Sequence, residues 1–340
     1  MDKALLSKTA AAMVATGRGL LAADESAGTC EKRFDSIGVA CTEETRRSYR
    51  GLLFSTPGIE RYLSGVILFD ETLRQKAADG SPIPKYLAAK GIIPGIKVDK
   101  GLVDLSLAPP GEKVTEGLDG LPKRLAEYFD LGARFAKWRA VITIGPDIPT
   151  HSCLYANAHA LARYAAACQA ASIVPIIEPE VLLDGGHSIE RCEEVTEAAL
   201  RACYAALAAY NVSLEHHILK ASMVVSGKAN ARQAPVDEVA QRTLRVLKRT
   251  VPAATPGIVF LSGGQSDEAA TAHLNAMAAT QNNAWPLTFS YSRALQNAPL
   301  HAWRGQAANT ERAQQAFDHR ARMNSLASQG KWNKALETRG

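Results

Sequence analysis

The sequence predicts an α/β protein with a closed (β/α)8 TIM barrel, and three observations support this fold class. Eight short apolar or β-branched runs recur along the 340 residues, helical patterns separate several of them, and polar residues stand at or near their ends. Strands that alternate with helices pair in parallel through right-handed crossovers. Closing eight strands leaves no exposed sheet edge, which favours a barrel over an open doubly wound sheet. No G-x-G-x-x-G follows the first run, which argues against a dinucleotide-binding fold.

The eight expected strands span residues 19–24, 65–71, 92–99, 134–144, 172–180, 216–222, 257–264 and 287–293. Helices are expected over residues 152–171, 188–211 and 235–252, with Ser152 and Ser188 as N-caps. Apolar residues at helical spacing before Gly17 predict an N-terminal capping helix. No linker composition divides the chain, so residues 1–340 are expected to form one barrel domain that also has a C-terminal helix. Segments 79–84 and 108–112 are expected to be barrel loops.

Composition excludes several classes of protein. Hydrophobic residues make up 46% and charged residues 21% of the chain, as in ordinary globular proteins. The net charge is +5 and the basic residues are scattered, so a nucleic-acid partner is not expected. No apolar run reaches about 18 residues, which argues against a membrane span. No metal site is indicated, because the six cysteines form no C-x-x-C pair and the eight histidines show no H-E-x-x-H spacing. The lack of a targeting segment favours a cytoplasmic location.

Charged residues two positions apart mark one face of three expected strands. A strand has a period of two, so the members of each pair share a face. The outer face would meet the helix layer, where charges have poor partners, and enzymes with this fold keep their chemistry at the C-terminal mouth. We therefore expect a ring of charges inside the mouth, although interior salt bridges that only fill the barrel remain an alternative for any single residue. The pairs are Lys97 with Asp99, Lys137 with Arg139, and Glu178 with Glu180.

Lys220 is the strongest candidate nucleophile. It is the only charged residue in its expected strand, "HHILKAS", and apolar residues flank it. A lysine that is partly desolvated and crowded by other cations gives up its proton more readily, which exposes the lone pair that attacks a carbonyl. Glu178 and Asp24 are placed to transfer the protons that such a reaction requires.

Two late segments indicate phosphate binding. In "FLSGGQS", the hydroxyl of Ser262 and the backbone N–H groups of Gly263 and Gly264 can form an anion-binding concavity just before a helix. In "FSYSRAL", Arg293 can supply a charged fork. Both segments close the last two strands, where barrels of this type frequently bind phosphate.

Ten motifs together carry a family resemblance. "LLAADES", "GVILFDETL", "GIKVDKGLVDL", "EGLDGL", "GARFAKWRAVITIG", "LARYAAACQ", "IVPIIEPE", "ILKASMV", "FLSGGQS" and "FSYSRALQ" occur in order over about residues 8–332. In this respect the chain closely resembles class I fructose-bisphosphate aldolases. The resemblance implies reversible cleavage of fructose 1,6-bisphosphate through a lysine Schiff base, without a metal or other cofactor, in a cytoplasmic homotetramer.

The resemblance also implies roles for individual residues. Lys220 matches the Schiff-base lysine and Glu178 the main acid–base carboxylate. Asp24 matches the residue that assists C–C cleavage, Lys137 the charge that guides protons, and Glu180 is expected to orient Lys220. The C1 phosphate is expected to contact Ser262, Gly263, Gly264, Ser292 and Arg293. The other phosphate and the sugar hydroxyls are expected to contact Ser26, Thr29, Arg33, Lys97 and Arg139.

Three departures from the family pattern leave alternatives open. Ala221 replaces a proline and Ser292 replaces a glycine, and the chain ends at Gly340 without the long tail whose terminal tyrosine protonates the enamine in animal and plant members. Either the tail is missing from the sequence given, or another acid or water serves this step. One alternative is a Schiff-base aldolase that prefers another ketose, such as sedoheptulose 1,7-bisphosphate or a monophosphate ketose. Another is a non-catalytic sugar-phosphate or cytoskeletal binding protein.

Overall fold

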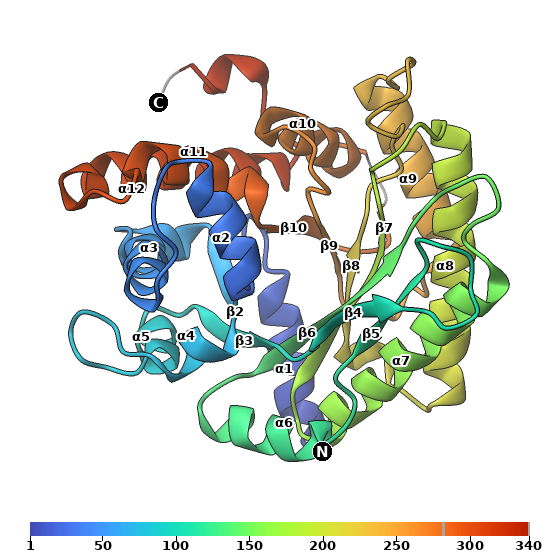
Figure 1. Cartoon of the computed structure of the whole chain (residues 1–340), viewed down its shortest axis with the longest axis horizontal. Helices are drawn as coiled ribbons and strands as arrows, with labels where there is room; N and C mark the ends of the chain where they lie inside the picture. Colours follow the sequence, from blue (N-terminus) through green and yellow to red (C-terminus); the bar gives the residue numbers. More distant parts are fainter. Residues whose placement is uncertain (281–282, 339–340) are drawn as a thin grey trace.

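Eight parallel strands close into a barrel, which confirms the predicted fold class (Figure 1). The computed structural model describes residues 1–280 and 283–338, so residues 339 and 340 of the expected domain, and residues 281 and 282, lie outside the described residues. The strands follow each other around the barrel in the order β1-β10-β9-β8-β7-β6-β3-β2. Their bounds are β1 Gly19–Ala23, β2 Leu63–Leu68, β3 Ile93–Lys97, β6 Phe135–Ile142, β7 Val174–Val181, β8 Ile218–Ala221, β9 Ile258–Phe260 and β10 Leu287–Tyr291.

Helices surround this barrel and cover its outer face (Figure 1). Those in the first half of the chain are α1 Lys3–Met13, α2 Ala27–Asp35, α3 Glu43–Ser55, α4 Asp70–Arg74, α5 Ile83–Ala89 and α6 Leu121–Asp130. Those in the second half are α7 His151–Ala170, α8 Ile189–Ala209, α9 Val236–Thr250, α10 Asp267–Ala278, α11 Arg293–Trp303 and α12 Thr310–Ala327. Short 3-10 helices cover Ile59–Arg61, Leu214–His216, Ala307–Asn309 and Lys334–Leu336.

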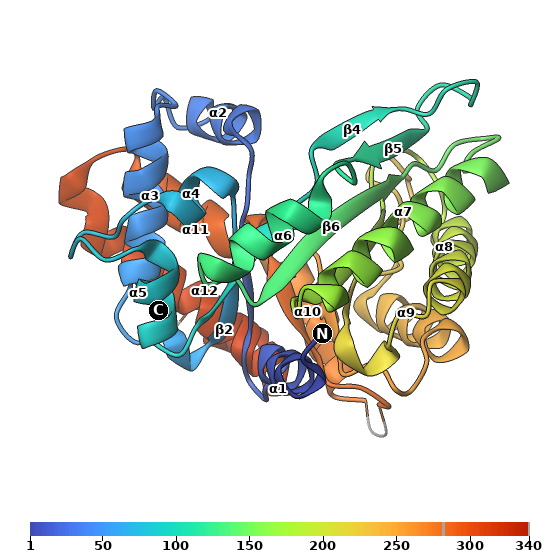
Figure 2. The ribbon, with the colours of Figure 1, turned by 90° about the horizontal axis from the view of Figure 1, so that it is seen from below.

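Helix α1 closes one end of the barrel. Its buried residues Leu6, Ala10 and Met13 form an apolar cluster with residues that point into the barrel, such as Phe135 and Ile218. Figure 2 shows α1 at the end of the molecule opposite to α2 and to the hairpin of β4 (Gly101–Asp104) and β5 (Lys113–Glu116). One end of the barrel is therefore filled by apolar side chains, and the other end is left for polar chemistry.

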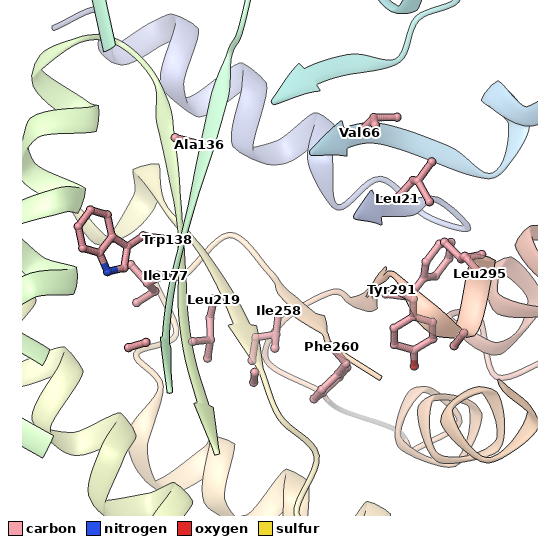
Figure 3. Packing of buried hydrophobic residues seen from close by; sticks show 14 of the residues in the cluster. Leu21, Val66, Ala136, Trp138, Ile177, Leu219, Ile258, Phe260, Tyr291 and Leu295 are labelled. Carbon is pink, nitrogen blue, oxygen red and sulfur yellow. The ribbon is translucent and has the colours of Figure 1, made fainter. Parts of the chain in front are cut away.

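The outward-facing strand residues form a second, larger apolar cluster with the helices. Figure 3 shows Trp138, Ile177 and Leu219 from neighbouring strands in this cluster. The rings of Trp138 and Tyr164 of α7 lie 5.5 Å apart between centroids, so the strand is fixed against its covering helix. This packing explains why charged residues on these strands face the barrel interior.

The structure corrects several element boundaries. Most of the expected strands were too long at their C-terminal ends. For example, Glu71 lies in α4, Gly264 lies beyond β9, and Arg293 begins α11. The expected N-cap Ser152 was wrong, because the hydroxyl of Thr150 accepts the capping bond from the N–H of Cys153. Ser188 caps α8 as predicted.

Segment 108–112 is more than a barrel loop. It joins two antiparallel strands, β4 Gly101–Asp104 and β5 Lys113–Glu116, into a hairpin between β3 and α6. The sequence did not predict this hairpin. Its strand β4 contributes Gly101 and Leu102 to the rim of the main cavity.

Candidate active site

The barrel interior changes from apolar to charged along each strand. On β7, Val174 and Ile176 belong to the apolar cluster near α1, and the next two residues on the same face are Glu178 and Glu180. On β8, Ile218 is followed on its face by Lys220. The expected placement of the charges inside the C-terminal mouth is therefore confirmed by the strand geometry.

Backbone register places charged residues of adjacent strands opposite one another. In the parallel pairing of β3 with β6, Lys97 stands opposite Lys137, and in that of β6 with β7, Arg139 stands opposite Glu178. Two lysines on adjacent strands would repel each other without nearby carboxylates. Lys97 binds Asp99 with an Nζ to Oδ1 distance of 2.7 Å, and this pairing balances its charge.

Four side chains from four strand ends form the centre of the mouth. Lys220 Nζ lies 2.9 Å from Oε1 of Glu178, whose Oε2 lies 3.5 Å from Lys137 Nζ. Lys137 Nζ also lies 2.6 Å from Oδ2 of Asp24. All four residues are at least 92% buried, so a continuous chain of alternating charges crosses the bottom of the cavity.

Asp24 and Lys137 each shift the pKa of the other. Burial alone would raise the pKa of Asp24, but the ammonium groups of Lys137 and Lys220 outweigh burial and lower it to about 2. Burial would lower the pKa of Lys137, but Asp24 and Glu178 outweigh that effect and hold it well above its usual value. Lys137 therefore stays a cation and Asp24 a carboxylate across the physiological pH range.

Glu180 is bound differently from expectation. Its Oε2 accepts a hydrogen bond from Nε of Arg139, whereas Lys220 contacts Glu178. Glu180 and Arg139 still line the same cavity as Lys220. The contact supports a role for Glu180 in fixing Arg139, and the expected role of Glu180 in orienting Lys220 stays a prediction.

The expected phosphate site lies at a tight glycine turn after β9. Ser262 follows β9 and is buried, and Gly263 and Gly264 have φ angles of +61° and +89°. The two glycines allow a tight turn in which the N–H of Gln265 donates to the carbonyl oxygen of Ser262. Backbone N–H groups in such a turn can form an anion-binding nest. Partial desolvation, together with the positive charges of Arg33 and Arg139, lowers the pKa of the Arg293 guanidinium from its usual value. This cluster of positive charges favours the binding of an anion.

Helix α2 brings further polar groups to the mouth. The hydroxyls of Ser26 and Thr29 lie 3.2 Å apart at its start. Arg33 donates hydrogen bonds to Oε1 of Glu25, at 2.6 Å, and to Oγ of Ser292, at 3.0 Å. The hydroxyl of Ser292 in turn donates to Glu25 at 2.5 Å. The serine that replaces the family glycine thus ties α2 to the start of α11.

One cavity of about 1150 Å³ contains nearly the whole predicted site. Its lining includes every expected site residue except Gly264, which adjoins the lining residue Gly263: Asp24, Ser26, Thr29, Arg33, Lys97, Lys137, Arg139, Glu178, Glu180, Lys220, Ser262, Gly263, Ser292 and Arg293. Residues from the first strand to the last therefore converge on one site.

Ser290 and Glu25 are among the polar residues of this cavity that sequence reasoning missed. Ser290 lies on β10 with its side chain inside the barrel, and its buried hydroxyl has no hydrogen-bond partner among the described residues. It stands two positions before Ser292, so the period of two could have found it. Glu25 also lines the cavity. It follows Asp24 directly, but its contacts with Ser292 and Gln296 come from the far end of the chain.

Neither a metal-ligand cluster nor a membrane-spanning helix is found in the part of the chain that the structure describes. Within residues 1–280 and 283–338, no three His, Cys, Asp or Glu side chains are grouped so that they could hold a metal ion. In the same part of the chain, no helix combines the length and the apolar character that crossing a membrane requires.

Comparison with known proteins decides the family. A family model described as "Fructose-bisphosphate aldolase class-I" matches residues 5–340. The chain belongs to the class I fructose-bisphosphate aldolase family. A "Probable fructose-bisphosphate aldolase class 1" from Xanthomonas campestris pv. campestris is 60% identical over 328 residues, which cover 96% of this chain and 98% of the relative. The resemblance seen in the motifs is therefore confirmed.

More distant aldolases agree in sequence and in fold. "Fructose-bisphosphate aldolase 6, cytosolic" from Arabidopsis thaliana is 52% identical, over 92% of this chain and 87% of the relative. The solved structure of fructose-bisphosphate aldolase from Plasmodium falciparum, in complex with TRAP and a small-molecule inhibitor, superposes with a TM-score of 0.95 at 48% identity. The superposition covers 97% of this chain and 95% of that one.

Proposed function

We propose that the mouth of this barrel catalyses the reversible aldol cleavage of fructose 1,6-bisphosphate to dihydroxyacetone phosphate and glyceraldehyde 3-phosphate. The observation that carries the proposal is the environment of Lys220. Its amine is buried, its Nζ lies 2.9 Å from Glu178, and it faces a cavity lined by cationic and hydroxyl groups. Membership of the aldolase family supports the same reaction.

Lys220 forms the covalent intermediate. Its proton passes to Glu178, and the free amine attacks the C2 ketone to give a carbinolamine. Glu178 returns a proton to the hydroxyl on C2, which leaves as water, and an iminium remains. Because Glu178 lies within hydrogen-bond distance of Nζ, it can move both protons without a change of strand geometry. The iminium then polarises the carbon skeleton, so the reaction needs no metal or other cofactor.

Carbon–carbon cleavage follows. A base removes the proton from the C4 hydroxyl, the C3–C4 bond breaks, and its electron pair moves into the iminium to give an enamine while glyceraldehyde 3-phosphate leaves. Asp24 supports this step as a carboxylate, which the ammonium of Lys137 keeps ionised. Proton return to C3 restores the iminium, and water then releases dihydroxyacetone phosphate and free Lys220.

The two ends of the substrate have different binding groups. The nest of Ser262, Gly263 and Gly264, together with Arg293, is suited to the C1 phosphate. At the other end, Lys97, Ser26 and Thr29 offer one cation and two hydroxyls from β3 and α2. Arg33 of α2 donates a hydrogen bond to Ser292, so its guanidinium also lies beside the residues expected at the C1 phosphate.

Two further properties belong to this proposal. Relatives from Arabidopsis thaliana and Spinacia oleracea are named cytosolic or cytoplasmic, which supports a cytoplasmic location for this chain as well. The resemblance to the family supports a homotetramer. Light scattering during gel filtration measures the mass of the assembly and tests this point.

Borohydride trapping tests the proposed function. We expect fructose 1,6-bisphosphate and borohydride, in the presence of EDTA, to leave a sugar-phosphate or three-carbon phosphate adduct that peptide mass mapping assigns to Lys220. Lys220→Met should show no adduct and no cleavage, whereas Lys248→Met, at an exposed position on α9, should behave as the wild type. An adduct on another lysine, or no cleavage by the wild type, would contradict the proposal. The same assay with sedoheptulose 1,7-bisphosphate compares the two ketoses.

A further inference from the structure

The loops that follow β7 and β8 are joined to each other by their backbones. The N–H groups of Gly227, Lys228 and Ala229 donate to the carbonyl oxygens of His187, Leu183 and Gly185, each at 2.9 Å. The two loops approach so closely that a Cβ on Gly227 would lie 2.4 Å from the Gly185 oxygen. The backbone of Lys228 is therefore held in one place at the rim of the barrel.

The side chain of Lys228 extends from this fixed backbone to the phosphate nest. A Cβ added at Gly264 would lie 2.8 Å from Nζ of Lys228 and 2.9 Å from Nη1 of Arg293. Both cationic groups thus lie over the same glycine, which has a φ of +89°. Lys228 comes from the loop after β8, and no periodic pattern in the sequence predicts that it reaches this site.

Two like charges over one glycine repel each other unless an anion lies between or beside them. In the structure Lys228 is balanced by Asp184, whose Oδ1 lies 3.2 Å from Nζ. The side chains of Lys228 and Asp184 are 44% and 70% exposed, and an ion pair in water contributes little stability. Lys228 can therefore leave Asp184 for a stronger anion at small cost.

We propose that Lys228 is a further phosphate-binding residue, which contacts the C1 phosphate of the substrate together with Arg293 and the nest at Ser262–Gly264. This inference rests on the proposed function, which supplies the phosphate. Over Gly264 the nest has one guanidinium, that of Arg293, and the neighbouring Arg33 is already paired with Glu25. A sugar phosphate, in contrast, carries close to two negative charges at neutral pH. The ammonium of Lys228 supplies the second positive charge. Asp184 holds the side chain near the nest while the site is empty.

The condensation direction separates the two phosphates of the reaction. The phosphate of dihydroxyacetone phosphate becomes the C1 phosphate, and that of glyceraldehyde 3-phosphate becomes the other one. For Lys228→Met we expect the KM for dihydroxyacetone phosphate to rise about tenfold, with the KM for glyceraldehyde 3-phosphate and kcat unchanged. Lys248→Met is the matched control, because it removes an exposed lysine on α9 and should change neither KM.

Asp184→Asn distinguishes phosphate binding from a structural ion pair. Without its partner, Lys228 is free to face the nest, so the KM for dihydroxyacetone phosphate should fall about twofold or stay as in the wild type. If Asp184→Asn raised this KM as much as Lys228→Met does, the pair would act only by holding the two loops, and the inference would be overturned. An unchanged KM in Lys228→Met would overturn it as well.

Calorimetric titration with inorganic phosphate gives a readout that needs no turnover. Lys228→Met should bind phosphate about tenfold more weakly than the wild type and Lys248→Met do. If the wild type failed to cleave the sugar, the proposed function would fail, yet this titration would still decide whether Lys228 binds phosphate. Equal dissociation constants in all three proteins would show that it does not.

Discussion

Lys137→Met removes the central positive charge of the site and keeps the volume of the side chain. In the wild type, Nζ of Lys137 lies 2.6 Å from Asp24 and 3.5 Å from Glu178. The pKa of Asp24 is about 2 instead of 3.8, and this difference corresponds to about 2–3 kcal/mol of stability at neutral pH. Loss of one partner also leaves a buried carboxylate with less compensation. We therefore expect Lys137→Met to lower the free energy of unfolding by about 3 kcal/mol at pH 7.5.

The pH dependence of this loss identifies its cause. The wild-type contribution of Asp24 is fully present above pH 3.8 and is lost as the pH falls through about 2. In Lys137→Met, burial remains while the nearest cation is gone, so we expect the pKa of Asp24 to rise above its usual value of 3.8 and the carboxyl group to begin to protonate near pH 4.5. The difference in stability between wild type and variant should therefore be smaller at pH 4.5 than at pH 7.5.

Urea denaturation of both proteins at the two pH values, at one fixed protein concentration, measures this difference. Turnover of fructose 1,6-bisphosphate should fall by a factor of about 100 or more, because Lys137 positions the groups that transfer protons. Lys248→Met, at an exposed position, serves as the control. A loss below about 0.5 kcal/mol, or a loss of equal size at both pH values, would refute the electrostatic argument.

Two other predictions concern stability. Burial lowers the pKa of His217 to about 4, so between pH 6.5 and pH 4 the unfolded chain binds a proton that the folded chain does not. Acidification through this range should lower the free energy of unfolding by about 1.4 kcal/mol per pH unit. His217→Gln should reduce the slope of this free energy against pH by the same amount. An unchanged slope would show that His217 is not the group responsible. On β3, a Cβ at Gly95 would lie 2.2 Å from Cε2 of Phe135, so Gly95→Ala should destabilise the protein by about 1–3 kcal/mol. Gly51 in α3 has no atom within 4 Å of such a Cβ, so Gly51→Ala should raise stability by up to about 1 kcal/mol. Thermal denaturation measures both effects, and equal effects of the two substitutions would argue against the steric explanation.

The sequence predicted the charged ring well, because alternation along a strand fixes the face of every residue. Lys137, Glu178 and Lys220 could be placed inside the mouth without any knowledge of their partners. The partners themselves depend on side-chain conformations across the barrel. Glu180 was therefore expected at Lys220, but its contact is with Arg139.

Residues outside the strands were harder to predict. Lys228 approaches Arg293 only because two loops join by backbone hydrogen bonds, and neither loop has a periodic pattern. The β4–β5 hairpin was missed for a related reason. Leu102 and Val103 are adjacent apolar residues and both are partly exposed, so they lack the alternation that indicates a strand with one buried face.

The register of the barrel strands links catalysis to refolding. Lys97 stands opposite Lys137, and Arg139 opposite Glu178, through backbone pairing alone. A slip of one residue on any of these strands would turn its charges into the apolar helix layer. Recovery of enzymatic activity after dilution from denaturant would therefore count only molecules whose barrel has closed in register. The helical circular dichroism signal would also include molecules whose helices have formed but whose barrel has not closed in register.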